Sequence, residues 1–185
     1  MVRPLEERFR TVRDLFPEFR VETRRGRLLV NESGTWQHNT ILFQLLFQLV
    51  GPVAARGWEI WPNITVYLGQ HADRYVPDLT VVPETPRMEE DHTVHGDSTL
   101  LLVSVVSASS FYDDYFVKPG DYSPNGVPFY LVIDPFRREV KLFSEPGGKE
   151  YGRETVAMGG EPLTLPDPWN LALDTGKLLY GDDGA

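Results

Sequence analysis

The sequence predicts a single domain of mixed α and β structure (α/β with α+β character), in which helices flank a sheet. Two stretches, residues 4–16 and 37–53, have apolar side chains at helical spacing. Residues 100–106 are almost all aliphatic, which is typical of a strand covered on both faces at the centre of a sheet. With 185 residues, of which 41% are hydrophobic, the chain is long enough for one core and short for two.

Each predicted element has its own signal. Apolar residues three and four positions apart indicate helices, and β-branched or aromatic runs between turn-forming residues indicate strands. Arg24 and Arg25 are expected to project from the tip of a hairpin, and Asp73 and Arg74 are expected in a turn. In chain order, we expect a helix at 4–16, a hairpin at 20–23 and 27–31, a helix at 37–53, strands at 58–61, 64–68, 78–82 and 100–106, and strands at 127–133 and 139–144, with a polar connection at 83–97. Residues 112–122 are expected to form a helix that, because of Pro119 and Gly120, either begins near Pro119 or is distorted.

Composition limits the class of protein. Residues 1–185 are expected to form one domain, with an N-terminal helix at 1–16, a core at 17–175 and a flexible tail at 176–185. The chain has no cysteine, which excludes disulfides and thiolate metal sites and fits a cytoplasmic location. No apolar run approaches the roughly 20 residues needed to span a bilayer. The net charge of −9 argues against coating nucleic acid through bulk electrostatics but allows a local basic face.

Chemically capable side chains surround the most buried predicted strand. Asp78 begins the strand before it, Ser104 lies within it, and Asp114, Lys118 and Tyr122 follow at spacings of four. Residues four apart share one face of a helix. Simpler interpretations exist, since Asp78 can cap backbone donors, Lys118 can be solvated, and Ser104 can bond a backbone carbonyl in the core.

Several short motifs occur in a recognisable order. They are Val21-Glu22, Gly26, His38, Pro77-Asp78, Leu102-Val103-Ser104-Val105-Val106-Ser107, Asp114, Lys118, Tyr122, Gly126-Val127-Pro128-Phe129-Tyr130 and Asp134-Pro135. Across residues 17–175 this order resembles the Uma-type restriction endonuclease family, also called domain of unknown function 820, of the PD-(D/E)XK nuclease superfamily. The resemblance implies a restriction-endonuclease-like core with a central mixed sheet flanked by helices.

The resemblance also implies roles for particular residues. Asp78 matches the motif aspartate, Lys118 the lysine carried on a helix, and Glu22 an additional acidic residue. Where the family's second motif reads Glu-Val, this chain reads Ser104-Val105. The resemblance implies a DNA endonuclease that uses Mg²⁺, or Mn²⁺ in its place, if it is active. Glu22, Asp78 and the carbonyl of Val105 would then be the metal ligands.

Ser104 is therefore the residue that decides between two hypotheses. Phosphodiester hydrolysis needs a Mg²⁺ held by hard oxygen ligands, commonly carboxylates, and a serine hydroxyl is a poor replacement. The first hypothesis is a Mg²⁺-dependent DNA endonuclease, weakened at this position. The second is a catalytically silent relative that binds nucleic acid or a protein. A homodimer is expected under the first, because restriction-type nucleases often cut two strands as symmetric dimers.

Other candidate groups have less support. His38 is interpreted as a contact at the end of a helix rather than as a ligand. The four histidines lack the spacing of a zinc site. No histidine and aspartate accompany the serines at 107–110 in the pattern of a nucleophilic triad.

Overall fold

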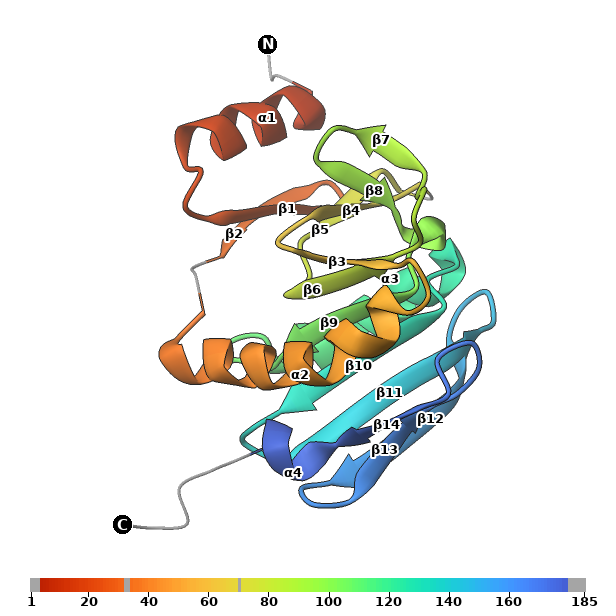
Figure 1. The fold of residues 1–185 in the computed structure, drawn as a ribbon. Coiled ribbons are helices and arrows are strands. Elements are labelled where there is room, and N and C mark those ends of the chain that lie inside the picture. The colour runs from red at the N-terminus through yellow and green to blue at the C-terminus, as the bar shows by residue number, and fades with distance from the viewer. Residues whose placement is uncertain (1–3, 32–33, 70, 180–185) are drawn as a thin grey trace.

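The computed structural model describes residues 4–31, 34–69 and 71–179, which form mixed α and β structure with two six-stranded sheets (Figure 1). The first sheet has the order β2-β1-β5-β4-β8-β7, the second has the order β12-β11-β10-β9-β6-β3, and β13 pairs with β14. The helices are α1 (Leu5–Leu15), α2 (Trp36–Ala54), η1 (Gly96–Ser98), η2 (Asp113–Val117), α3 (Lys118–Tyr122), η3 (Ser123–Asn125) and α4 (Thr175–Leu178). The strands are β1 (Arg20–Arg24), β2 (Arg27–Asn31), β3 (Glu59–Pro62), β4 (Thr65–Leu68), β5 (Asp73–Tyr75), β6 (Leu79–Val82), β7 (Met88–Glu90), β8 (Thr93–His95), β9 (Leu101–Val105), β10 (Phe129–Asp134), β11 (Glu139–Pro146), β12 (Tyr151–Met158), β13 (Pro162–Leu165) and β14 (Leu171–Asp174).

The second sheet carries the main core. Its strand β9 pairs parallel with β10 and antiparallel with β6, and both β9 and β10 are buried along their whole length. Helix α2 crosses one face of this sheet (Figure 1). Leu45 and Leu49 of the helix belong to the same apolar cluster as Val103 of β9. The predictions of a buried central strand and of a long amphipathic helix are thus confirmed.

Side chains alternate along β9, so its two faces meet different partners. Val103 belongs to the cluster under α2, whereas Leu102 and Val106 belong to a second cluster that contains Tyr122 of α3. Ser104 is in phase with Leu102 and Val106. Its hydroxyl therefore faces the α3 side of the sheet.

Two segments predicted to lack regular structure are strands of the first sheet. The expected turn at Asp73 and Arg74 is part of β5, and the expected polar connection contains β7 and β8. For β5 the prediction is wrong because partners distant in sequence bury its polar residues. Arg74 is 5% exposed, forms an ion pair of 2.9 Å with Glu6, and lies over the rings of Phe9 and Tyr67.

Of the two alternatives predicted for residues 112–122, the distorted helix is confirmed: the π-helical η2 continues into α3, which contains Pro119 and Gly120, and η3 follows. In η2 the chain makes a π-helical turn, and the backbone N–H of Lys118 donates to the carbonyl of Asp113, five residues earlier. Pro119 lies in the first turn of α3, where its missing N–H has least consequence. The π-turn and the proline together direct Lys118 toward β9.

The last described segment packs onto the core. Leu178 and Leu179 are 1% and 3% exposed and belong to the cluster under α2. Of the flexible tail expected at 176–185, residues 176–179 therefore lie in α4 and the turn after it, and 180–185 lie outside the described residues. Among the described residues, no helix is long and apolar enough to cross a membrane.

Two neighbouring residues of α2 test the packing directly. Leu45 is 0% exposed and Phe43 is 55% exposed. We predict that Leu45→Ala lowers the free energy of unfolding by about 2–5 kcal/mol, because it leaves a cavity under the sheet. The larger truncation Phe43→Ala should change it by only about 0.5 kcal/mol. Urea denaturation checks both, and equal losses would contradict this placement of the helix.

Candidate active site

The structure brings the four predicted site residues to one place. Glu22 lies in β1, Asp78 precedes β6, Ser104 lies in β9 and Lys118 begins α3. Asp78 Oδ2 accepts a hydrogen bond of 2.7 Å from the backbone N–H of Val105, and Lys118 Nζ donates one of 3.1 Å to Ser104 Oγ. None of the four is more than 8% exposed. They form a buried polar site on the α3 side of β9.

Asp78 has a cation and a histidine on the same oxygen. Its Oδ1 accepts from the guanidinium of Arg20 and lies 2.9 Å from His38 Nε2. Burial alone would raise the pKa of Asp78, but the hydrogen bond from His38 and the charge of Arg20 outweigh burial and lower it to about 2. Asp78 is therefore an ionised carboxylate with both oxygens engaged. The ring of His38, interpreted from the sequence as a helix-end contact, is one of its partners.

Both carboxylate oxygens of Glu22 also accept hydrogen bonds, and one of the donors is an arginine. Its Oε1 accepts from the backbone N–H of Val76 at 2.8 Å, and its Oε2 accepts from Asn31 Nδ2 at 3.2 Å and from Arg24. Arg24 also forms an ion pair with Asp113 of η2. Because Arg24 pairs with these two carboxylates, its side chain lies in the site and is only 11% exposed. The prediction that Arg24 projects from the hairpin tip is therefore wrong.

Lys118 is held by the residues on its own side of the sheet. Its Nζ donates to Asp114 Oδ1 at 2.6 Å, and the hydroxyl of Tyr130 lies 3.4 Å from the same oxygen. The predicted shared face of Asp114 and Lys118 is present. Ser104, expected to bond a backbone carbonyl, instead accepts from Lys118. The lysine charge is thus balanced by Asp114.

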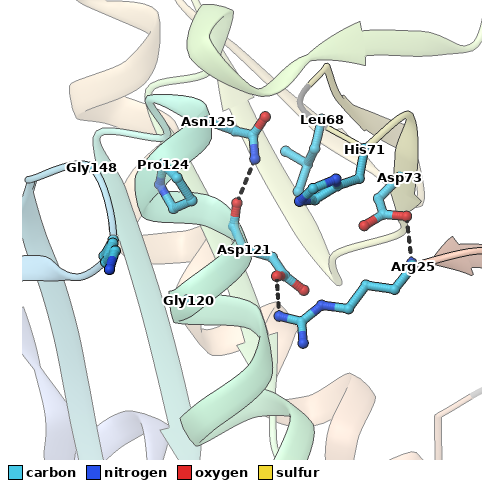
Figure 2. Close-up of a pocket in the computed structure, with 10 residues that line it drawn as sticks. Arg25, Leu68, His71, Asp73, Gly120, Asp121, Pro124, Asn125 and Gly148 are labelled. Atoms are coloured by element: carbon cyan, nitrogen blue, oxygen red, sulfur yellow. Dashed lines mark hydrogen bonds and ion pairs between the residues drawn. The ribbon is translucent and has the colours of Figure 1, made fainter.

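A cavity of about 220 Å³ lies between the turn of the hairpin at Arg25 and the helical segment that contains Asp121 (Figure 2). Arg25 spans it: its guanidinium donates to Asp121 Oδ1 at 2.7 Å and its backbone N–H donates to Asp73 Oδ1 at 2.6 Å. The hydroxyl of Tyr75 donates to the other oxygen of Asp121 at 2.5 Å. Arg25 therefore fastens the turn of the hairpin to α3 and β5, which holds the preceding residue, Arg24, over Tyr75.

The residues present do not fit a divalent cation. All four carboxylate oxygens of Glu22 and Asp78 already accept hydrogen bonds, and each carboxylate has an arginine partner. Across residues 4–31, 34–69 and 71–179, no group of three or more histidine, aspartate and glutamate side chains is arranged to hold a metal ion. The negative charge that would attract Mg²⁺ is neutralised by guanidinium groups from within the chain.

Two unpaired polar atoms indicate what the site lacks. Arg24 Nε and the hydroxyl of Tyr122 are buried and have no hydrogen-bond partner among the described residues. Burial and the charge of Glu22 raise the pKa of Tyr122 well above its ordinary value, so the phenol is protonated. Both atoms carry a proton to donate. The site thus has unpaired hydrogen-bond donors, which an acceptor oxygen would satisfy and a cation would not.

Comparisons with known proteins identify the family of this chain. Residues 7–176 match the model of the Uma2 family, described as "Putative restriction endonuclease". The chain belongs to this family. An uncharacterized protein of Synechocystis sp., sll1609, is 23% identical over 128 residues, which cover 68% of this chain and 72% of that protein. Among solved structures, a "putative nuclease belonging to DUF820" from Anabaena variabilis superposes with a TM-score of 0.65 at 15% identity, covering 86% of this chain and 89% of its own.

Sequence reasoning missed the two arginines of this Uma2 family member. Arg20, Glu22 and Arg24 are two positions apart on β1, and side chains at that spacing point to the same face of a strand. The alternation Arg-x-Glu-x-Arg was therefore a usable signal. It was not enough alone, since it does not reveal that the second carboxylate, Asp78, lies within reach of the same face.

The pKa of Asp78 leads to a pH prediction for the Uma2 fold. A carboxylate whose pKa is lowered on folding stabilises the native state above its unfolded pKa, near 3.8, and loses that contribution as the pH falls through about 2. We predict that Asp78→Asn is less stable than the natural chain at pH 7 by roughly 2 kcal/mol. The difference should shrink between pH 4 and pH 2. Urea denaturation across this range checks it, and a constant difference would contradict the ion pair.

Proposed function

We propose that this Uma2 family member binds DNA on a nuclease fold without hydrolysing it through a divalent metal. One observation carries the proposal: Arg20 and Arg24 neutralise Asp78 and Glu22 at the position where the family's chemistry needs acidic ligands, and Ser104 stands where a further carboxylate is expected. Family membership supports DNA as the ligand, because the family is described as restriction endonucleases.

The energetics favour the arginines over a metal ion. Removing one partner from a buried ion pair costs on the order of 3–5 kcal/mol, because the other charge is left without compensation. A metal ion that displaced the guanidinium groups would compensate the carboxylates but leave Arg20 and Arg24, whose side chains are 23% and 11% exposed, without their partners. Since every 1.4 kcal/mol is about tenfold in affinity, even one displaced pair corresponds to roughly a hundredfold weaker metal binding.

A partly exposed arginine of the site supports binding to phosphate oxygens. The side chain of Arg20 is 23% exposed, and arginine is well suited to phosphate because its donors are planar and permanently charged. With a net charge of −9 the protein cannot rely on bulk attraction to DNA. Binding is accordingly local, and its affinity falls as the salt concentration rises.

A second candidate is a weak Mg²⁺- or Mn²⁺-dependent DNA endonuclease. It is favoured by the retention of Lys118 beside β9, with Asp78 and Glu22 on the same side of the sheet. In this function Lys118 would orient the attacking water or stabilise charge on the phosphate. Its charge is available only in part, because Asp114 already forms a 2.6 Å ion pair with it.

Plasmid cleavage in Mg²⁺ or Mn²⁺ separates the two candidates. We predict no cleavage by the natural chain and metal-dependent nicking by Ser104→Glu combined with Arg24→Met, which restores one carboxylate and releases another. Adding Asp78→Ala to that double variant should abolish nicking. Cleavage by the natural chain that Asp78→Ala removes would establish the endonuclease instead.

A matched variant isolates the contribution of Arg24. Arg27 is exposed and pairs with Arg24 across the hairpin register. Ser104→Glu with Arg27→Met changes total charge as much as the test variant but leaves the Arg24–Glu22 pair intact. It should nick plasmid at least about tenfold more slowly than the variant with Arg24→Met, because the buried pair still opposes metal binding. Equal rates for the two double variants would mean that Arg24 does not control the site.

A further inference from the structure

An exposed aromatic surface lies next to the candidate active site. Tyr112 and Phe116 are 68% and 61% exposed, which is far more than large aromatic side chains of a core. Tyr112 directly precedes η2 and Phe116 lies within it, and this π-helical segment continues into Lys118. The chain therefore presents two large rings to solvent within a few residues of the site.

The rings form one contiguous cluster. Tyr112 and Phe116 have ring centroids 5.5 Å apart, Phe111 lies 6.2 Å from Phe116, and Phe111 lies 4.7 Å from Tyr115. The π-helical turn brings residues five apart onto the same face, which is why Phe111 meets Phe116. Tyr115 is fixed from below, since its hydroxyl donates to Glu139 Oε1 at 2.6 Å and lies 3.1 Å from Asp134 Oδ2. The outer rings thus rest on a rigid base.

Cations border this surface. The guanidinium of Arg137, in the turn between β10 and β11, lies 4.3 Å from the ring centre of Phe111 and 5.6 Å from that of Tyr115. Arg137 and its neighbour Arg138 are both exposed. The nearest acid on η2, Asp113, is already paired with Arg24. The exposed guanidinium of Arg137 on this aromatic cluster, with exposed Arg138 next to it in sequence, complements a ligand that has both anionic groups and flat aromatic faces.

We propose that Phe116 and Tyr112 form a stacking surface for unpaired nucleobases of DNA, with Arg137 and Arg138 contacting the phosphates. The inference rests on the proposed DNA-binding function and specifies the kind of DNA. Bases in a duplex are stacked on one another and offer no free face, whereas unpaired bases stack on aromatic side chains with little sequence preference. The ligand is therefore single-stranded DNA or a duplex with an unpaired segment.

The same chain offers a matched control. Phe43 and Phe47 of α2 are 55% and 70% exposed and have ring centroids 4.7 Å apart, so they are a second exposed aromatic pair. They lie on the helix that covers the opposite face of the second sheet, away from Lys118. A general effect of removing two exposed rings would appear equally in both pairs.

Fluorescence anisotropy with a labelled 20-nucleotide single strand and the corresponding duplex tests the proposal. The natural chain should bind the single strand more tightly. Tyr112→Ala with Phe116→Ala should weaken single-strand binding about tenfold or more, since each stacked base contributes roughly 1–3 kcal/mol, and should leave duplex binding nearly unchanged. Phe43→Ala with Phe47→Ala should have no effect. Tyr112→Phe with Phe116→Tyr, which keeps both rings, should retain the affinity of the natural chain.

Other outcomes would overturn the proposal in distinguishable ways. If the natural chain binds duplex but the alanine pair at 112 and 116 loses no single-strand affinity, the stacking surface is wrong and the proposed function stands. If neither DNA binds, both are wrong. If sedimentation shows a dimer that only this alanine pair dissociates, with single-strand affinity unchanged, the surface is an interface between two copies of the chain.

Discussion

The ion pairs on one face of β1 join the two sheets and determine what the site can bind. β1 belongs to the first sheet, whereas Asp78 directly precedes β6 of the second, so the Arg20–Asp78 pair crosses from one to the other. Arg24 makes a similar link from Glu22 to Asp113 of η2. Buried pairs of this kind add little net stability compared with apolar packing, but each member becomes indispensable to its partner. Glu22 and Asp78 are consequently committed to arginines.

The small side chain at position 104 belongs to the same arrangement. Lys118 reaches β9 because Ser104 leaves room for its ammonium group, and it takes its counter-charge from Asp114. A glutamate at 104 would compete with Asp114 for that lysine. In this chain the serine at 104 and the arginines on Glu22 and Asp78 act in the same direction, because both reduce the negative charge that would attract a cation.

The parts of the fold that the sequence predicted well are those with local and repetitive signals. The apolar spacing of α2 and the unbroken aliphatic run of β9 depend only on neighbouring residues. β5, β7 and β8 have three residues each and contain polar side chains, so no period is visible in them. Arg74 is buried in β5 only because Glu6 and two aromatic rings come to it from elsewhere in the chain.

In the candidate site, too, residues with a local signal were predicted and residues with distant partners were missed. Glu22, Asp78, Ser104 and Lys118 were identified through motif order, and they do converge. The positions of Arg20 and Arg24 were missed, because they depend on partners 58 and 89 residues away. Such contacts leave no local pattern, and the hairpin turn at Arg24 and Arg25 suggested exposure instead. Residues that decide the chemistry of a buried polar site are those whose partners are most distant in sequence.

A crystal structure of the full chain grown in Mn²⁺ tests the central claim most directly, because Mn²⁺ scatters anomalously and is an oxygen-preferring ion. The predicted result is the Arg24 guanidinium on Glu22 and the Arg20 guanidinium on Asp78, with no anomalous peak between the two carboxylates. A peak bonded to both Glu22 and Asp78, with Arg24 displaced, would contradict it.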